Sequence, residues 1–343
     1  MDYTISEVLR GTKVGNLQSV GVMQIIPLIC KDKELYDLNI ISPQDKDVET
    51  SLSTHNYGEM KFRNPDPEKV LLIPCHAGYV TKHAAQDHAM SRAGLVGKGD
   101  KSFDDAMCIQ QSQGGYIPEG QHDMLVLPFS LRESAFNKRG ERSYYKLWDD
   151  ISRFNASFEV SATGNLDNFL SAFRDELDQF VAEFEIVPKQ IGAIILINGS
   201  VTGVERAPNP RYWSELWRPL VRECYGSLSI EVARKNSRTP TSRLRVPLKS
   251  RGLGSLEDLE REIERAEAEE DKRVREIVRE LLDDPFSDKV EDTMNGYDIV
   301  SLENDQFNGQ VLRKSRSIVY ASMFTKAKWA KDAPWNRASK FAI

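Results

Sequence analysis

The sequence predicts an α+β protein with a β-rich N-terminal half, followed by an αβ half that contains a long charged helix. Three observations predict this class. Short aliphatic runs separated by Gly, Pro, Asn and Asp fill the first 130 residues, as in strands joined by turns. Apolar residues then recur at helical spacing between residues 165 and 185. A charged stretch with a narrow apolar seam follows at 255–284, and it is the predicted long helix.

The composition is that of a globular protein. The 343 residues are 40% hydrophobic and 29% charged, and the formal net charge is −6. This charge supplies no positive field for nucleic acid, so the sequence argues against a nucleic-acid partner. There is no apolar run of about 18 residues for a membrane span, and the start lacks the pattern of a secretory signal. With four cysteines and no CxxC spacing, we expect a cytoplasmic protein with reduced thiols and no membrane association.

The first half is expected to contain mostly strands. They are predicted at 20–29, 34–41, 69–73 and 124–127, and the apolar run 125–131 suggests that the last one extends further. The apolar spacing from Tyr144 to Phe154 predicts a helix after Ser143, which is a suitable N-cap.

The second half is expected to alternate between helices and strands. The predicted elements are a helix at 165–185 ended by Pro188, strands at 191–197 and 200–205, a helix at 212–225 and a strand at 226–233. Asn198-Gly199 between the first two strands is the preferred dipeptide of a two-residue hairpin. Trp213 and Trp217 share one helical face and are expected to pack in the core.

Residues 234–251 contain seven Lys or Arg and are predicted to be an exposed basic linker. The long helix begins at Ser255, with Asp258 in the capping-box position. Its seam could pair with a second copy, which predicts a homo-oligomer, or pack on its own domain. The chain closes with strands such as 298–302 and 317–324, with a turn at Asn308-Gly309. The predicted division is a domain at 1–155 and a domain at 156–343, although the halves could share one core.

The candidate site lies in the first half, because four of the five histidines fall between residues 76 and 122. The acid–base candidates are His83 and His88, since imidazole titrates near neutral pH. The candidate ligand-binding groups combine positive charge, amides, a carboxylate and a glycine that allows close backbone approach. They are Lys82, Gln86, Asp87, Arg92, Gln111, Gln113, Gly114 and Arg132. Arg132 and Glu133 could point into the site or form a surface ion pair.

Three interpretations of this region remain open. The first is a pocket for an anionic, nucleotide-like ligand. The second is a metal-dependent hydrolase with the ligand set His76, His83, Asp87, His88 and His122, although the spacing matches no standard motif and HExxH is absent. The third is a polar surface turn. In that case the protein would be an inhibitor, a ligand sponge or an assembly subunit, acting through the long helix and the basic linker. The sequence identifies no cofactor.

Several segments resemble the ARG-and-rhodanese-phosphatase-associated protein family, an uncharacterised prokaryotic and viral group. They are GVMQIIPLI, ELYDLNI, LLIPCHAGYVTKHAAQDHAM, IGAIILINGSVTGVERAPNPRYWSELWRPLVRECY and GQVLRKSRSIVYASMF. The family has a glycine followed by a Gly-x-x-Gln-x-Arg-like segment where this chain has Gly78 and then residues 82–88. Gly78 and Gln86 carry over from this pattern, whereas His88 stands where the family has arginine. The long helix looks like an insertion. The family name implies a setting in ADP-ribose and NAD metabolism, and so the resemblance implies a ligand of this type.

Overall fold

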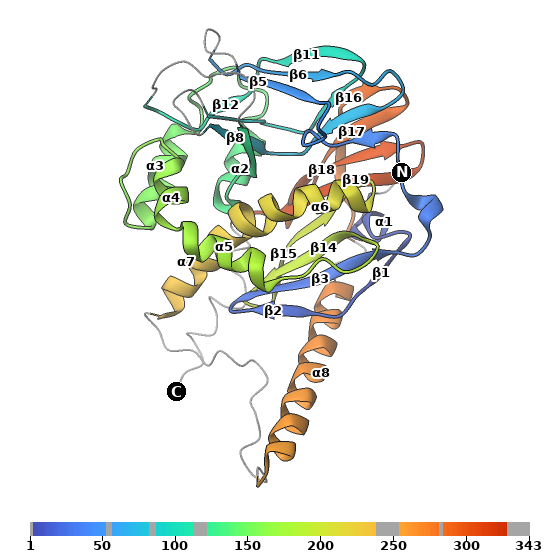
Figure 1. The fold of residues 1–343 in the computed structure, drawn as a ribbon, viewed down its shortest axis with the longest axis vertical. Helices are drawn as coiled ribbons and strands as arrows, with labels where there is room; N and C mark the ends of the chain where they lie inside the picture. The colour runs from blue at the N-terminus through green and yellow to red at the C-terminus, as the bar shows by residue number, and fades with distance from the viewer. Residues whose placement is uncertain are drawn as a thin grey trace.

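The computed structural model describes residues 3–52, 57–81, 87–112, 122–237, 254–280 and 284–327. It has a β-rich N-terminal region, central helices and a C-terminal antiparallel sheet, and this confirms the mixed α+β class (Figure 1). Within these ranges, no helix is both long and apolar enough to cross a membrane.

The main sheet is antiparallel and combines strands from both ends of the described chain. Its order is β1-β3-β14-β15-β19-β18-β17-β16, and β2 also pairs with β3. The bounds are β1 Thr12–Val14, β2 Gln18–Val20, β3 Met23–Cys30, β14 Gln190–Ile197, β15 Ser200–Arg206, β16 Ser287–Met294, β17 Tyr297–Glu303, β18 Phe307–Lys314 and β19 Ser317–Thr325. All residues of β14 are buried, because both faces of the sheet are covered at its centre.

Three smaller sheets form the rest of the β-rich region. The first contains β4 (Ile40–Ile41), β7 (Val70–Ile73) and β10 (Gly94–Val96), and the second contains β5 (Glu49–Leu52), β6 (Met60–Asn64) and β11 (Gly99–Phe103). The third has the order β12-β9-β8-β13, with β8 at Ala77–Thr81, β9 at His88–Ala89, β12 at Met107–Cys108 and β13 at His122–Val126.

Residues 210–237, which form three consecutive helices, pack on one face of the main sheet (Figure 1). In chain order, the helices are α1 (Ile5–Val8), η1 (Lys33–Leu35), α2 (Phe129–Asn137), α3 (Trp148–Ser157), α4 (Asp167–Ala172), α5 (Arg174–Glu183), α6 (Pro210–Pro219), the π-helix η2 (Leu220–Tyr225), α7 (Gly226–Ser237) and α8 (Leu256–Glu280). Trp213 and Trp217 lie in the core as predicted, with ring centroids 5.6 Å apart. This core cluster also contains Met23 and Phe324, so it combines residues from both sides of position 155, and the division into two domains stays a prediction.

Several local signals in the sequence are confirmed. Asn198 and Gly199 connect β14 to β15, and both have the positive φ of a type I′ turn, at 49° and 75°. The Ser255 hydroxyl accepts the backbone N–H of Asp258 at 3.1 Å, as expected for the N-cap of α8.

Other boundaries were wrong because tertiary contacts or local caps override the pattern. Residues 226–233 form helix α7 rather than a strand, since Leu228 and Val232, one helical turn apart, both enter the core. The helix predicted at 165–185 is two helices with a break at Phe173, whose ring stacks on Phe169 at 5.1 Å. The helix after Ser143 begins only at Trp148.

Two predicted strands are also interrupted. Gly21, with φ +59°, makes a turn that divides 20–29 into β2 and β3. In 34–41 the Asp32 carboxylate caps the short helix η1 by accepting the N–H of Glu34 at 3.1 Å, so only Ile40–Ile41 remain a strand. The turn expected at Asn308-Gly309 is displaced, because Asn304 caps the backbone of Gln306 and Phe307 while Gly309 lies inside β18.

Helix α8 extends away from the body of the molecule (Figure 1). Its C-terminal end is attached: Val278 belongs to a core cluster, and Arg275 donates to the backbone carbonyl of Gly15 at 3.1 Å. At its other end Leu256 is 71% exposed. Pairing of this helix with a second copy stays a prediction. The predicted basic linker begins later than expected, since 234–237 belong to α7, and 238–251 lie outside the described residues.

Candidate functional site

Half of the predicted site lies outside the described residues. The predicted residues that the structure does not describe are Lys82, His83, Gln86, Gln113 and Gly114. The side chain of His122 also lies outside the described residues. The remaining predicted residues are Asp87, His88, Arg92, Gln111 and Arg132, and the structure gives each of them different partners.

His88, Asp87 and Gln111 support local backbone structure. His88 is fully buried in β9, and its Nε2 accepts the backbone N–H of Gly58 at 3.1 Å. The backbone carbonyl of Asp87 accepts the N–H of Ile109 at 2.9 Å. The Gln111 amide oxygen accepts the N–H of Gly164 at 2.8 Å. These contacts place the three residues around the loops at 57–58 and 109–112.

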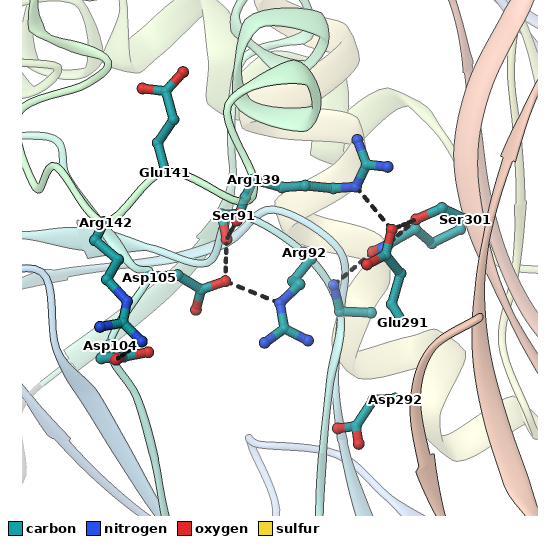
Figure 2. Close-up of polar contacts among 12 residues, drawn as sticks. Ser91, Arg92, Asp104, Asp105, Arg139, Glu141, Arg142, Glu291, Asp292 and Ser301 are labelled. Carbon is teal, nitrogen blue, oxygen red and sulfur yellow. Dashed lines mark hydrogen bonds and ion pairs between the residues drawn. The ribbon is translucent and has the colours of Figure 1, made fainter. Parts of the chain in front are cut away.

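Arg92 belongs to a charged network between the β-rich region and the main sheet. Figure 2 shows Arg92 and Ser91 directed at Asp105, to whose carboxylate each donates at 2.9 Å. On the neighbouring side Arg139 donates to Glu291 on β16 at 3.0 Å (Figure 2). Arg92 therefore already has a carboxylate partner within the β-rich region, and Arg139 makes the contact to the main sheet.

Arg132 lies on helix α2 and not after a strand, because the chain leaves β13 at Val126 and the helix begins at Phe129, directly after Pro128. Its side chain is 0% exposed, so the alternative of a surface ion pair is wrong. Nη1 donates to Glu205 Oε1 at 2.8 Å and Nη2 donates to Ser322 Oγ at 2.6 Å. The Arg132 Nε–H donates to His76 Nδ1 at 3.3 Å. The guanidinium is thus enclosed by β15, β19 and the turn between β7 and β8.

We call Arg132, Glu205, Tyr225, Ser322 and His76 the Arg132 centre, and all five are buried. The Tyr225 hydroxyl donates to Glu205 Oε1 at 2.7 Å. Burial, together with the nearby positive charge of Arg132, holds the pKa of His76 well below its ordinary value, so the imidazole is neutral at physiological pH. The centre therefore connects four elements through one buried charge pair.

Two buried thiols flank this centre. Burial raises the pKa of Cys75 and of Cys224 to about 12, although Arg132 opposes the shift. Both thiols are therefore protonated at neutral pH, which makes them poor nucleophiles.

The local structure around Tyr225 explains how it reaches the centre. Pro219 has no N–H to continue the α6 hydrogen-bond pattern, and the chain passes into the π-helix η2 immediately after it. Across from η2, Gly203 on β15 leaves room for the Tyr225 hydroxyl, which a Cβ at position 203 would approach to 1.9 Å. A glycine in a strand here marks the close approach of a side chain.

Glu223, also on η2, predicts a pH dependence of stability. Burial raises its pKa to about 7, although Arg222 beside it opposes the shift. Because the folded pKa lies above the unfolded value of 4.5, the folded state binds more protons, and stability falls as pH rises from 4.5 to 7. Glu223→Gln is expected to match the wild type near pH 4 and to exceed it by about 3 kcal/mol at pH 8. Urea denaturation across this range measures the difference, and a constant difference would contradict the assignment.

An exposed group of rings lies next to His88 and Gln111. We call Tyr57, Tyr144, Tyr145 and Trp148 the aromatic patch. Tyr57 stacks on Tyr144 at 5.1 Å, and Trp148 contacts Tyr144 at 5.6 Å and Tyr145 at 5.8 Å. Tyr57 is 45% exposed and Tyr145 is 55% exposed, whereas Tyr144 and Trp148 are half-buried. Such an arrangement is unusual, because large rings are normally buried on average.

The predicted site residues hold this patch in place. The His88 contact with Gly58 fixes the residue that follows Tyr57. Cys108 donates its N–H to the carbonyl of Tyr144 at 2.8 Å. Gly164, held by Gln111, packs directly on Trp148. The apolar spacing of YYKLW predicts only a helix, so the patch is not apparent from that pattern. The sequence does contain one signal for the patch. Three aromatic residues fall within five positions, at the start of a helix that buries other positions.

Among the described residues, no group of three or more His, Cys, Asp or Glu could hold a metal ion. The predicted metal-ligand set also includes His83 and His122, and the side chains of these two residues lie outside the described residues. His76, another member of that set, is directed at Arg132.

Comparison with known proteins gives one family. A model of the ARG and Rhodanese-Phosphatase-superfamily-associated Protein domain matches residues 11–324. A search of curated proteins and a search of solved structures found no match. The matched range runs from β1 to the end of the last strand and includes α8, the Arg132 centre and the aromatic patch. The chain therefore belongs to the ARG and Rhodanese-Phosphatase-superfamily-associated Protein domain family.

Proposed function

We propose that the protein binds a nucleotide-derived small molecule of the ADP-ribose type, with its base stacked on the aromatic patch. The observation that carries the proposal is the exposure of Tyr57 and Tyr145 in a group of four rings in mutual contact. Stacking on aromatic side chains contributes about 1–3 kcal/mol per base and suits any base, because every base has a π-face.

The surroundings of the patch suit the rest of such a ligand. Arg142, two residues before Tyr144, is 84% exposed and 3.7 Å from the exposed Asp104 (Figure 2). An exposed surface pair of this kind is weak, so the guanidinium can exchange its partner for a phosphate at little cost. In this proposal His88 and Gln111 are positioning residues, since their contacts hold the loops that carry the rings.

The family to which the chain belongs also supports the proposed class of ligand. Its description names an association with ARG and rhodanese-phosphatase proteins, and the resemblance implies ADP-ribose metabolism. The proposed ligand class combines this setting with the stacking surface. The proposed function is binding, and catalysis is not part of it.

Isothermal titration calorimetry with ADP-ribose tests the proposal. The wild type is expected to bind, and Tyr145→Ala is expected to bind about tenfold more weakly, because a stacking contact of about 1.4 kcal/mol is lost. Tyr145→Phe keeps the ring and should retain the affinity of the wild type. Tyr36→Ala, a half-buried tyrosine outside the patch, controls for loss of a ring elsewhere. Equal affinity of Tyr145→Ala and Tyr145→Phe would overturn the proposal.

A further inference from the structure

A recess of about 280 Å³ lies at the N-terminus of α6, formed by residues other than those of the aromatic patch. Leu38, Ile40 and Ile41 line it with apolar surface. Asn209 fixes the start of the helix by accepting the N–H of Tyr212 at 2.9 Å, and its own amide donates to the carbonyl of Asp37 at 3.0 Å. The wall formed by the helix start is therefore rigid. The volume of the recess is just below the range typical of sites for drug-sized ligands, so the recess suits a smaller molecule.

Part of the lining is charged, and its charges balance. Arg211 donates to Asp45 at 3.0 Å and to Glu215 at 3.4 Å, and Lys69 also lines the recess. Two cations and two carboxylates around one small space do not favour a polyanion. They suit a molecule with a single anionic group and several hydroxyl groups, because carboxylates accept hydroxyl hydrogen bonds and guanidinium binds phosphate.

One atom of this lining lacks a partner. Glu215 Oε2 is buried and accepts no hydrogen bond from any residue that the structure describes. A buried carboxylate oxygen without a donor is unfavourable, and Glu215 is one of the residues that line the recess. The missing partner is a donor, which a sugar hydroxyl provides.

We propose that this recess, the α6 pocket, is a binding site for a sugar phosphate of about the size of a pentose phosphate. The sugar hydroxyls donate to Glu215 and Asp45, and the apolar face of the ring lies against Ile40 and Ile41. The phosphate is bound by Arg211 and Lys69. The same chemistry is present in a free sugar phosphate and in the phosphoribose end of a larger nucleotide, and the site does not require the aromatic patch.

Titration calorimetry with ribose 5-phosphate tests the site, with ribose and inorganic phosphate as separate probes. We expect ribose 5-phosphate to bind at least about tenfold more tightly than either probe, because both halves of the pocket are used. Arg211→Ala and Glu215→Ala are each expected to weaken its binding about tenfold. Arg218→Ala is the matched control, since Arg218 lies on the same helix with an exposed side chain and pairs with Asp178, away from the recess.

The outcomes separate this site from the proposed function. Tyr145→Ala should leave the affinity for ribose 5-phosphate unchanged even where it weakens ADP-ribose binding. Loss of ADP-ribose affinity in Arg211→Ala would identify the phosphoribose end of a nucleotide as the source of the ligand, and an unchanged affinity would identify a free sugar phosphate. Absence of ribose 5-phosphate binding by the wild type, or equal binding by Arg211→Ala, Glu215→Ala and Arg218→Ala, would overturn the site.

Discussion

Arg132→Met is expected to lower the free energy of unfolding by about 4 kcal/mol, the largest single-residue effect that we expect in this protein. The substitution keeps most of the side-chain volume and removes the guanidinium, which leaves the carboxylate of Glu205 buried with only the Tyr225 hydroxyl as a donor. An isolated buried charge is costly, whereas the intact pair is close to neutral for stability. Guanidinium denaturation at pH 7, followed by circular dichroism, measures the change.

Two further variants make this result specific. The double variant Arg132→Met with Glu205→Leu removes both charges and should regain a large part of the lost stability, because no unpaired charge remains. Lys235→Ala removes one partner of an exposed helix pair and should change stability by less than about 0.5 kcal/mol. If the double variant were no more stable than Arg132→Met, the charge-pair explanation of the centre would be wrong.

Gly203→Ala is expected to destabilise the protein by about 3 kcal/mol, although it adds only one methyl group. The new Cβ would lie 1.9 Å from the hydroxyl oxygen of Tyr225 and 2.6 Å from the ring carbon that carries it. This ring is fully buried between Glu205 and Arg132, so it cannot move aside without breaking both contacts. Denaturation under the same conditions gives the free-energy difference.

Gly140→Ala is the matched control for this substitution. A Cβ at position 140 meets no atom within 4 Å in the described structure, and its φ is not in the left-handed region. Its stability should therefore lie within about 0.5 kcal/mol of the wild type. A Gly203→Ala protein as stable as Gly140→Ala would show that Tyr225 does not occupy the position described here.

The buried centre and the two proposed binding sites can be examined independently. The Arg132 centre lies inside the protein, where α2, η2, β15 and β19 meet, and its variants change stability. The aromatic patch and the α6 pocket lie at the surface, and they are built by other residues. Variants of exposed side chains such as Tyr145 and Arg211 can therefore report on ligand affinity without loss of the fold.

Much of the candidate site was not accessible to sequence reasoning. Of the predicted site residues that the structure describes, His88 and Gln111 hold backbone loops rather than facing one recess. Their hydrogen-bond partners, Gly58 and Gly164, are 30 and 53 residues away in the chain. No spacing rule relates positions so far apart. Lys69 and Glu215, which line the α6 pocket together, are likewise brought together only by folding.

The sequence by itself determined the features that depend on neighbouring residues. The α+β class, the hairpin at Asn198-Gly199 and the cap at Ser255 follow from patterns within a few positions, because turn geometry, capping and alternation are local. Only the tertiary structure decided that 226–233 is a helix, that Gly309 lies within a strand against the backbone of Ser322, and that Arg132 is buried against Glu205. In each case the outcome depends on burial and on partners distant in sequence, and these contacts outweigh the local preference of the chain.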